Sequence, residues 1–519
     1  MSGAHIPPIA AGSAAGDGAA GRALVLAGGG MRVAYQAGAV KALYDAGLRF
    51  GHADGASGGT INLAALLSGE TPDALCARWR ALCVADFAGL RPAAEYLHLA
   101  NMRALGSADA MVRKVYPALG IDIERIRAAT GIEASFNVCR FDDKTIVPLP
   151  QAQLDLPRLV AAASLPVFLP AVEAQGSTWT DAVWIKDANL LACVERGARE
   201  LWLVWCIGNT PVYRNGAFNQ YVHMIEMSAL GALHWELAAI ADINRRIAAG
   251  ETVAGHDRPV VVHIVKPPVP LPLDPDFFRG RIDAATLIDM GYRDARRALR
   301  GRKPAALAPS ATAMREPGVG VGFRETMAGP FSLAKAGLAQ GAAATARLAM
   351  HATIHIDDIA AFVADPFHKA ELTGHLDFAP WGEAIPAQSG VFGLFSPSGD
   401  AALTYMVYEL GFRHGGRDYY LAGKKHVRLG GPWRLWKETT TLYTQLHEGT
   451  DATGEVVGSG VLRLGVPELA RLLGTVHASN GATPKARRGA VWRFFRFFVA
   501  ELARTYLRRR PLRSLRSTP

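Results

Sequence analysis

Ser57 is the residue of this sequence that most clearly suggests covalent chemistry. It lies in Gly55-Ala56-Ser57-Gly58-Gly59, which has the Gly-x-Ser-x-Gly pattern. Between a strand and a helix this pattern forms a nucleophile elbow, in which Gly55 and Gly59 leave room for a sharp turn that projects the serine oxygen. The flanking residues predict that context. The pattern alone also fits a glycine-rich turn whose serine caps a helix.

A second glycine-rich turn lies 27 residues earlier, at Gly28, Gly29 and Gly30. Backbone N–H groups in such a turn bind an anion, either a nucleotide phosphate or an oxyanion that forms during acyl transfer. The dinucleotide pattern Gly-x-Gly-x-x-Gly fails because Val33 occupies its third glycine position, and no Gly-Lys-Ser/Thr follows. The sequence therefore favours an oxyanion hole and predicts no cofactor.

An activated serine needs a base, and no histidine stands out for that role. His52 precedes the elbow but is expected within or before its strand, and His256 and His263 are expected on the surface or in strands. Residue types alone leave the base open.

Three motifs in order resemble the patatin-like phospholipases. "GGGMRVAYQAG" is similar to their oxyanion segment, "GASGG" to their elbow, and "AAASLPVFLPAVEAQGSTWTDAVWIKDANL" at 161–190 to the stretch around their catalytic aspartate. The resemblance covers about 21–300 and ends in the helix-like "DAATLIDMGYRDARRAL". It implies a layered α/β/α fold with a mostly parallel sheet. It also implies a serine hydrolase of fatty-acyl esters, most plausibly phospholipid, without metal or cofactor.

The resemblance assigns roles to three residues. Ser57 is implied as the nucleophile and Asp181 as the general base of a dyad without histidine, with Arg32 adding positive charge near the oxyanion loop. Asp187 is a fallback carboxylate, although a helix cap is the simpler interpretation.

Two positions depart from the family pattern. Val33 replaces a glycine after the basic residue, and Ala182-Val183 replaces Gly-Gly or Gly-Ala after the aspartate. A side chain with a Cβ is strained wherever φ is positive. The departures keep an alternative open, a non-catalytic lipid-binding or membrane-scaffold protein. Within the enzymes, a thioesterase or a transacylase also remains open.

Predicted strands and helices alternate over 21–300. This order indicates a mostly parallel sheet in a layered α/β fold, which must position these residues. The predicted strands are 23–27, 53–56, 134–140, 145–147, 178–181, 201–206 and 260–265. The predicted helices are 34–47, 58–69, 71–84, 105–117, 155–164, 189–198, 217–248 and 283–300. At 519 residues the chain is too long for one ordinary core.

The second half has a different pattern. A linker rich in proline, alanine and glycine is predicted at 303–322, and short aromatic and β-branched runs then predict an antiparallel sandwich or barrel at 323–480. "HIDDIAAFVADPFH" has no convincing metal-ligand spacing and predicts a capped helix. "GFRETMAGPF", "DDIAAFVADPFH" and "WKETTTLY" weakly resemble a module appended to some bacterial cholesterol-oxidase-like proteins, which implies no flavin here.

The net charge of the chain, +10, is concentrated at its end. Residues 485–519 hold one lysine and ten arginines against one glutamate, so the rest is nearly neutral and nucleic-acid binding by the body is excluded. Within the predicted segment 481–519, a helix would place aromatic residues on one face and arginines opposite. That pattern suits an anionic membrane surface, or equally a helix packed on its own domain. The aromatic face would comprise Val491, Phe494, Phe495, Phe498 and Leu502, and the basic face Arg493, Arg496 and Arg504.

The location of the protein is predicted from what the sequence lacks. Residues 1–20 have neither a basic start nor a continuous apolar stretch, so a disordered tail is expected rather than a signal peptide. No run has the length of a membrane span. Five scattered cysteines favour buried free thiols in a reducing compartment. We expect a cytoplasmic protein with a peripheral contact to the inner membrane surface.

Overall fold

The computed structural model describes residues 17–87, 89, 91–301, 309–333, 345–481 and 483–510. The chain divides into two compact units, 1–316 and 317–519. Residues 511–519 of the predicted basic segment and most of the predicted N-terminal tail lie outside the described residues. The last part of that tail, Asp17–Ala20, is a single helical turn, α1.

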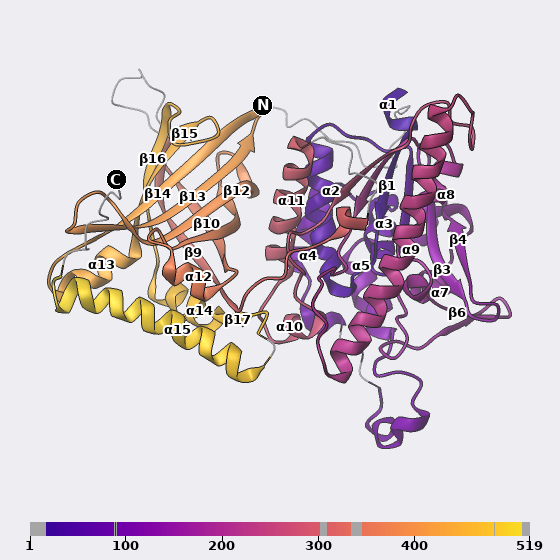
Figure 1. Cartoon of the computed structure of the whole chain (residues 1–519), viewed down its shortest axis with the longest axis horizontal. Helices are drawn as coiled ribbons and strands as arrows, with labels where there is room; N and C mark the ends of the chain where they lie inside the picture. Colours follow the sequence, from indigo (N-terminus) through magenta and orange to yellow (C-terminus); the bar gives the residue numbers. More distant parts are fainter. Residues whose placement is uncertain are drawn as a thin grey trace. The chain divides into compact units, whose positions relative to one another are not determined.

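The first unit is a mixed, mostly parallel sheet between helices (Figure 1). Its strands are β1 Arg22–Leu26, β2 His52–Ala56, β3 Glu133–Arg140, β4 Thr145–Pro150, β5 Val172–Ala174, β6 Ser177–Asp181, β7 Glu200–Val204 and β8 Val261–Val265. They lie in the order β5-β6-β3-β2-β1-β7-β8, with β4 also paired to β3. The strands from β3 to β8 along this order are parallel, whereas β4, β5 and β6 are antiparallel to their neighbours.

The helices of this unit cover both faces of the sheet. They are α2 Ala34–Asp45, α3 Gly59–Leu67, α4 Pro72–Ala81, α5 Tyr116–Ala118, α6 Ile123–Ala128, α7 Leu156–Ala162, α8 Leu190–Glu195, α9 Ala217–Ala248, α10 Asp274–Phe278 and α11 Ala284–Arg300. Alternate residues of β1 explain the layering: Leu24 and Leu26 pack with α2 and α11, while Ala23 and Val25 pack with α8 and α9. The predicted α/β/α fold is confirmed.

Two glycines let α2 and α11 approach each other closely. A Cβ on Gly38 would lie 1.9 Å from the carbonyl oxygen of Ile288, and one on Gly291 would lie 1.9 Å from that of Tyr35. The helix predicted at 105–117 is wrong over its first part. Residues 105–108 are not helical, and the helical structure that follows from Asp109 includes a π-helical turn at Met111–Val115 and the short α5.

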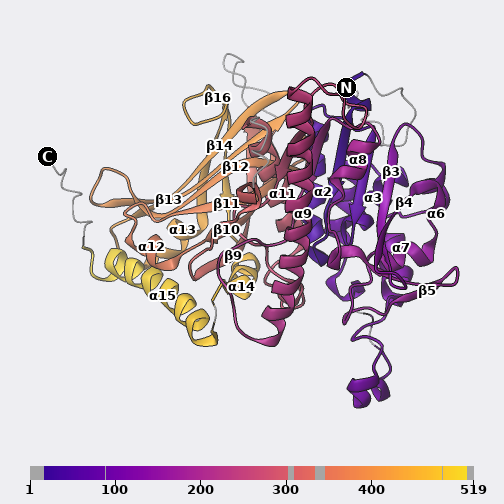
Figure 2. The same ribbon diagram turned by 45° about the vertical axis from the view of Figure 1, so that its right-hand side comes forward.

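The second unit is an antiparallel barrel (Figures 1 and 2). Its strands are β9 Gly320–Leu333, β10 Thr345–Ile356, β11 Lys369–Phe378, β12 Gly382–Pro397, β13 Leu403–His414, β14 Arg417–Arg428, β15 Thr441–Glu448, β16 Val456–Arg463 and β17 His477–Ser479. Each strand from β9 to β16 pairs with the next, and β16 pairs back to β9, which closes the barrel. The predicted antiparallel β fold is confirmed. The first strand begins at Gly320, inside the predicted linker.

Four helices accompany the barrel: α12 Ile359–Ala364, α13 Leu435–Thr440, α14 Val466–Thr475 and α15 Pro484–Leu502. The aromatic face of α15, yellow in Figure 1, packs against the barrel core. Phe494 is 7% exposed and its ring centroid lies 5.6 Å from that of Phe323. The helix packs on its own unit through the face that the sequence identified. Phe497, which was not on the predicted list, also contributes.

Candidate active site

Ser57 occupies a strained turn between β2 and α3. Its φ is +47°, in the left-handed region that non-glycine residues rarely adopt, and its side chain is buried. Gly59 permits the turn, because a Cβ there would lie 2.1 Å from the carbonyl oxygen of Leu26 at the end of β1. The hydroxyl therefore lies beside the N-terminus of α3, where the helix dipole favours developing negative charge.

The Ser57 hydroxyl donates to Asp181, the last residue of β6, with 2.6 Å between Oγ and Oδ2. The other carboxylate oxygen of Asp181 accepts from the amide of Val183 at 2.9 Å. Burial raises the pKa of Asp181 to about 7, although the bonds from Ser57 and Val183 lower it. The structure thus joins two residues 124 positions apart, one of them a carboxylate that titrates near neutrality.

The segment before Asp181 is fixed by backbone contacts. The carbonyl of Ser164, just after α7, accepts from the amide of Asp181 at 3.1 Å and from the hydroxyl of Thr180 at 2.9 Å. These bonds hold the end of β6 against the exit of α7.

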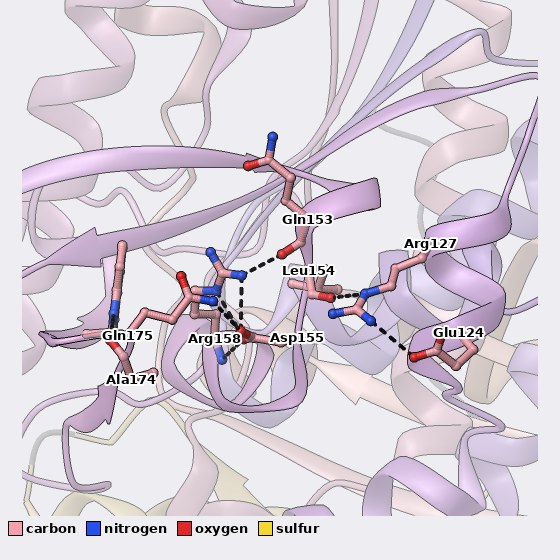
Figure 3. A network of polar contacts seen from close by, with 9 residues as sticks. Glu124, Arg127, Gln153, Leu154, Asp155, Arg158, Ala174 and Gln175 are labelled. Atoms are coloured by element: carbon pink, nitrogen blue, oxygen red, sulfur yellow. Dashed lines mark hydrogen bonds and ion pairs between the residues drawn. The ribbon is translucent and has the colours of Figure 1, made fainter.

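A polar network fixes the other end of α7 (Figure 3). Asp155 caps the helix by accepting from the amide of Arg158 at 2.9 Å, and it also accepts from Gln175 Nε2 at 3.1 Å. Arg158 donates in turn to the carbonyl of Gln153 at 2.6 Å. Because Gln175 lies in the turn between β5 and β6, the network ties that hairpin to α7. It is a positioning feature that sequence motifs did not reveal.

The glycine loop contains two amides without a protein acceptor among the described residues. Among the described residues, the amides of Gly29 and Gly30 donate to no protein acceptor. Gly30 has a φ of +58°, and a Cβ on Gly58 would lie 3.4 Å from its nitrogen. The loop therefore runs alongside the residue that follows Ser57. Two unpaired amides in a loop beside a strained serine suit an oxyanion.

The third predicted donor, Gly28, is engaged differently. Its amide donates to Asp187 Oδ2 at 2.9 Å. A Cβ on Gly28 would lie 2.4 Å from Asp187 Oδ1 and 3.1 Å from Ser57 Oγ, so the glycine separates two polar groups that a larger residue would displace. The amide of Gly28 is occupied in this arrangement, unlike those of Gly29 and Gly30.

Asp187 is a second buried carboxyl group near Ser57. Its Oδ1 atom has no hydrogen-bond partner among the described residues. Burial and the charge of Asp181 raise its pKa, while the Gly28 amide and Arg32 act in the opposite direction. Asp187 makes no hydrogen bond to Ser57, so the structure distinguishes it from Asp181.

Arg32 and Asp274 both make hydrogen bonds with the segment that contains the glycine loop. Arg32 Nε donates to the carbonyl of Gly29 at 2.9 Å, and the amide of Met31 donates to Asp274 Oδ1 at 3.1 Å. Burial raises the pKa of Asp274, and Arg32 opposes that shift. Sequence reasoning missed Asp274, which lies on the short α10, 243 residues after Met31. No local pattern around it indicates the contact.

The two departures from the family pattern carry no backbone strain. Val33 has a φ of −66°, and neither Ala182 nor Val183 is among the described residues with positive φ. Both positions accept a Cβ. The strain expected for a side chain with a Cβ at positive φ is therefore absent at these three residues.

Of the three histidines considered from the sequence, His52 begins β2 and His263 lies in β8, as expected. His256 is buried at an isolated bridge outside the named strands, so its expected place on the surface or in a strand is wrong. His52 Nδ1 lies 3.7 Å from Glu133, His256 Nε2 lies 2.8 Å from the carbonyl of Val194, and His263 stacks on Trp202. Of the cysteines, Cys83 is exposed, so the expectation that all are buried is wrong for this one.

A buried polar network below the elbow was also missed. Asp54 in β2 accepts from Ser135 Oγ and Asn137 Nδ2, each at 2.6 Å. Asn137 Oδ1 then accepts from Asn189 Nδ2 at 3.2 Å, two residues beyond Asp187. The network connects the strand that carries the elbow to the turn that carries Asp187. Its signal in the sequence is polar residues within otherwise apolar strands.

Part of the first unit is similar to a known protein family. A search of curated proteins found no match. Among solved structures, the crystal structure of VipD from Legionella pneumophila is similar at 14% identity and a TM-score of 0.28, covering 54% of this chain and 67% of that one. Residues 24–192 match the family model "Patatin-like phospholipase". At the level of the family, this match supports lipid acyl hydrolysis as the class of activity. By this match, the first unit carries a patatin-like phospholipase domain at residues 24–192.

Proposed function

We propose that this protein is a serine acyl hydrolase that cleaves fatty-acyl esters of lipids through Ser57 and Asp181. The 2.6 Å hydrogen bond from the strained, buried serine to a buried carboxylate carries the proposal. The unpaired amides of Gly29 and Gly30 support it. The family match supports a lipid as the substrate class.

In the first step, Asp181 accepts the hydroxyl proton of Ser57 while Oγ bonds to the ester carbonyl carbon. The carbonyl oxygen becomes an oxyanion, which the amides of Gly29 and Gly30 stabilise. When the tetrahedral intermediate collapses, the bond to the leaving alkoxide breaks, and protonated Asp181 returns its proton to that oxygen. The products are an alcohol and an acyl-serine.

In the second step, water attacks the acyl-serine and loses its proton to Asp181. The same amides stabilise the second oxyanion, and as it collapses the bond to Ser57 Oγ breaks and protonated Asp181 returns its proton to Oγ. The fatty acid is released and both Ser57 and Asp181 are restored. The same acyl-enzyme also reacts with a thiol or an alcohol if either replaces water, so acyl transfer belongs to the same chemistry.

Exposed apolar side chains on segments that are linked to the chain following Asp181 support a lipid substrate. Tyr221, on α9, stacks edge-on with Trp184, three residues after Asp181, and its hydroxyl donates to the carbonyl of Pro166 at 2.6 Å. The amide of Leu105 donates to the carbonyl of Val167 at 2.8 Å, which joins a third segment to this region. Leu105 and Val167 are exposed apolar residues of two of these segments, and those of α9 are Phe218, Met224, Met227 and Trp235. Such a surface is typical of proteins that contact lipid.

Hydrolysis is expected to depend on pH through Asp181. The carboxylate must be ionised to accept the serine proton, and its pKa is about 7. The value of kcat/KM should therefore fall about tenfold for each pH unit below 7 and level off above it. A pH profile with a p-nitrophenyl acyl ester, corrected for stability, measures this. A flat profile across this range would show that no base with this pKa limits the reaction.

Membrane contact through the C-terminal segment, predicted from its charge, would have to use the outward face of α15. The inward face is occupied by the barrel core. Trp492 is 69% exposed, and Lys485, Arg488, Arg493 and Arg496 are exposed beside it. Tryptophan and arginine together suit an anionic lipid surface. No described helix is both long and apolar enough to span a bilayer.

A pair of substitutions separates the two roles of α15. Phe494→Ala should lower the free energy of unfolding of the barrel unit by about 3–5 kcal/mol, because it removes a buried ring. Trp492→Ala should leave stability nearly unchanged and weaken sedimentation with anionic vesicles at low salt. Denaturant unfolding and vesicle sedimentation measure the two effects. Equal vesicle binding by wild type and Trp492→Ala would remove this helix from the membrane contact.

The substrate class is tested by incubating the purified protein with mixed bacterial-type lipids. Mass spectrometry should detect free fatty acids and the matching lyso-lipids. Ser57→Ala serves as the control that excludes contaminating lipases. If no lipid is consumed while a short ester is hydrolysed, lipid is the wrong substrate class.

A further inference from the structure

Three potential metal ligands gather on the outer surface of the barrel, in the unit for which no motif predicted chemistry. His351 lies on β10, and His375 and Asp377 lie on β11. The register places His351 directly opposite His375, and Asp377, two residues further along, shares their face of the sheet. The ligand atoms of all three lie within 4.8 Å of one another.

The ring of His351 is held in place from the neighbouring strand. Thr326, its register partner on β9, lies 3.1 Å from Nδ1 through its hydroxyl oxygen. This contact leaves Nε2 facing Asp377 Oδ2 at 2.9 Å. The ring also stacks on that of His375, with 4.7 Å between centroids. Metal-binding histidines commonly have their second nitrogen fixed in this way.

Asp377 is fixed from the other side by an irregularity in β12. The amide of Ala384 donates to Asp377 Oδ1 at 2.7 Å. Ala384 has a φ of +52°, a conformation that alanine rarely adopts, and the pairing of β11 with β12 shifts register nearby. Bulges of this kind redirect backbone groups at functional positions. The strained turn directs an N–H group at one carboxylate oxygen and leaves the other facing His351.

The types of these three side chains indicate which kind of ion they can bind. Neutral imidazole nitrogens and a carboxylate oxygen are typical zinc ligands, and three protein ligands leave a fourth position for water. His351 and Asp377 keep 31% and 39% of their side chains exposed, so an ion reaches them from solvent. We propose that His351, His375 and Asp377 bind one divalent transition-metal ion of the zinc type. The ion would link β10 to β11 on the outside of the barrel.

The test uses the full-length, tag-free protein, stripped with a chelator that is then removed. Equilibrium dialysis against Zn²⁺ should find one tight equivalent, and Co²⁺ should give the visible absorption of a four-coordinate site. His351→Ala and His375→Gln should each abolish this equivalent. His426→Ala, which alters an outward-facing histidine of β14, should retain it.

Thr326→Val tests the positioning of the ligand without removing one. It should weaken zinc binding about tenfold, because only the contact that orients His351 is lost. Zinc should also raise the Tm of wild type but not of His375→Gln. Absence of a saturable equivalent in wild type, or its survival in both histidine variants, would overturn the proposal. Ester hydrolysis is measured in the same samples, so failure here leaves the Ser57 assignment unaffected.

Discussion

Ser57→Ala is expected to reduce kcat/KM for a p-nitrophenyl acyl ester by at least about four orders of magnitude. In the proposed mechanism the hydroxyl is the nucleophile, so its removal leaves only the weak assistance that the amides of Gly29 and Gly30 give to direct attack by water. The variant should fold, because alanine deletes one oxygen and the turn already tolerates a Cβ at this φ. Initial rates at several enzyme concentrations measure the loss.

The matched control is Ser68→Ala. Ser68 is also buried, at the end of α3, and its hydroxyl donates to the carbonyl of Ala64 at 2.8 Å. Activity should survive there with a modest loss of stability. Comparable activity in wild type and Ser57→Ala would mean that another group is the nucleophile.

Asp181→Asn is expected to lower kcat by about four orders of magnitude. Asparagine keeps the shape of the side chain and still accepts from the amide of Val183, so the fold should be retained. Its amide does not accept the serine proton at any relevant pH. The residual rate should also lose the pH dependence centred near 7.

Asp187→Asn is the comparison that identifies the base. Asp187 accepts from Gly28 rather than from Ser57, so this variant should keep most of the activity. If Asp187→Asn were inactive and Asp181→Asn active, Asp187 would be the base. Similar losses in both would indicate that the two carboxyls act as one unit.

Site residues could be predicted from the sequence where a short motif marks them. They were missed where their role depends on contacts with residues far away in the chain. Ser57 and the glycine loop lie in short glycine-rich turns, and a few consecutive glycines are enough to predict such a turn. Asp181 was found through the family pattern alone, because nothing in its own neighbourhood predicts a contact with Ser57. Asp274 and the occupation of Gly28 by Asp187 depend on contacts 243 and 159 residues apart, which no local pattern encodes.

The fold shows the same limit. Alternating runs predicted the layered sheet and the antiparallel second unit, but short elements such as β5 and α10 have too few residues for a periodic signal. Closure of the barrel depends on the pairing of β16 with β9. Because β9 begins inside the predicted linker, its first residues were not predicted as a strand. Amphipathicity located α15 correctly, yet a membrane and a barrel core select the same aromatic face. The packing of Phe494 and its neighbours on the barrel core distinguishes the two.

The most direct test of the central claim is covalent labelling with a fluorophosphonate, which forms a stable ester with an activated serine. Intact-mass measurement should find one adduct on wild type, and peptide mapping should locate it at Ser57. Asp181→Asn should label much more slowly, and Ser57→Ala should not label. An unlabelled, folded wild-type protein, or an adduct at any other residue, would contradict the assignment of Ser57 as an activated nucleophile.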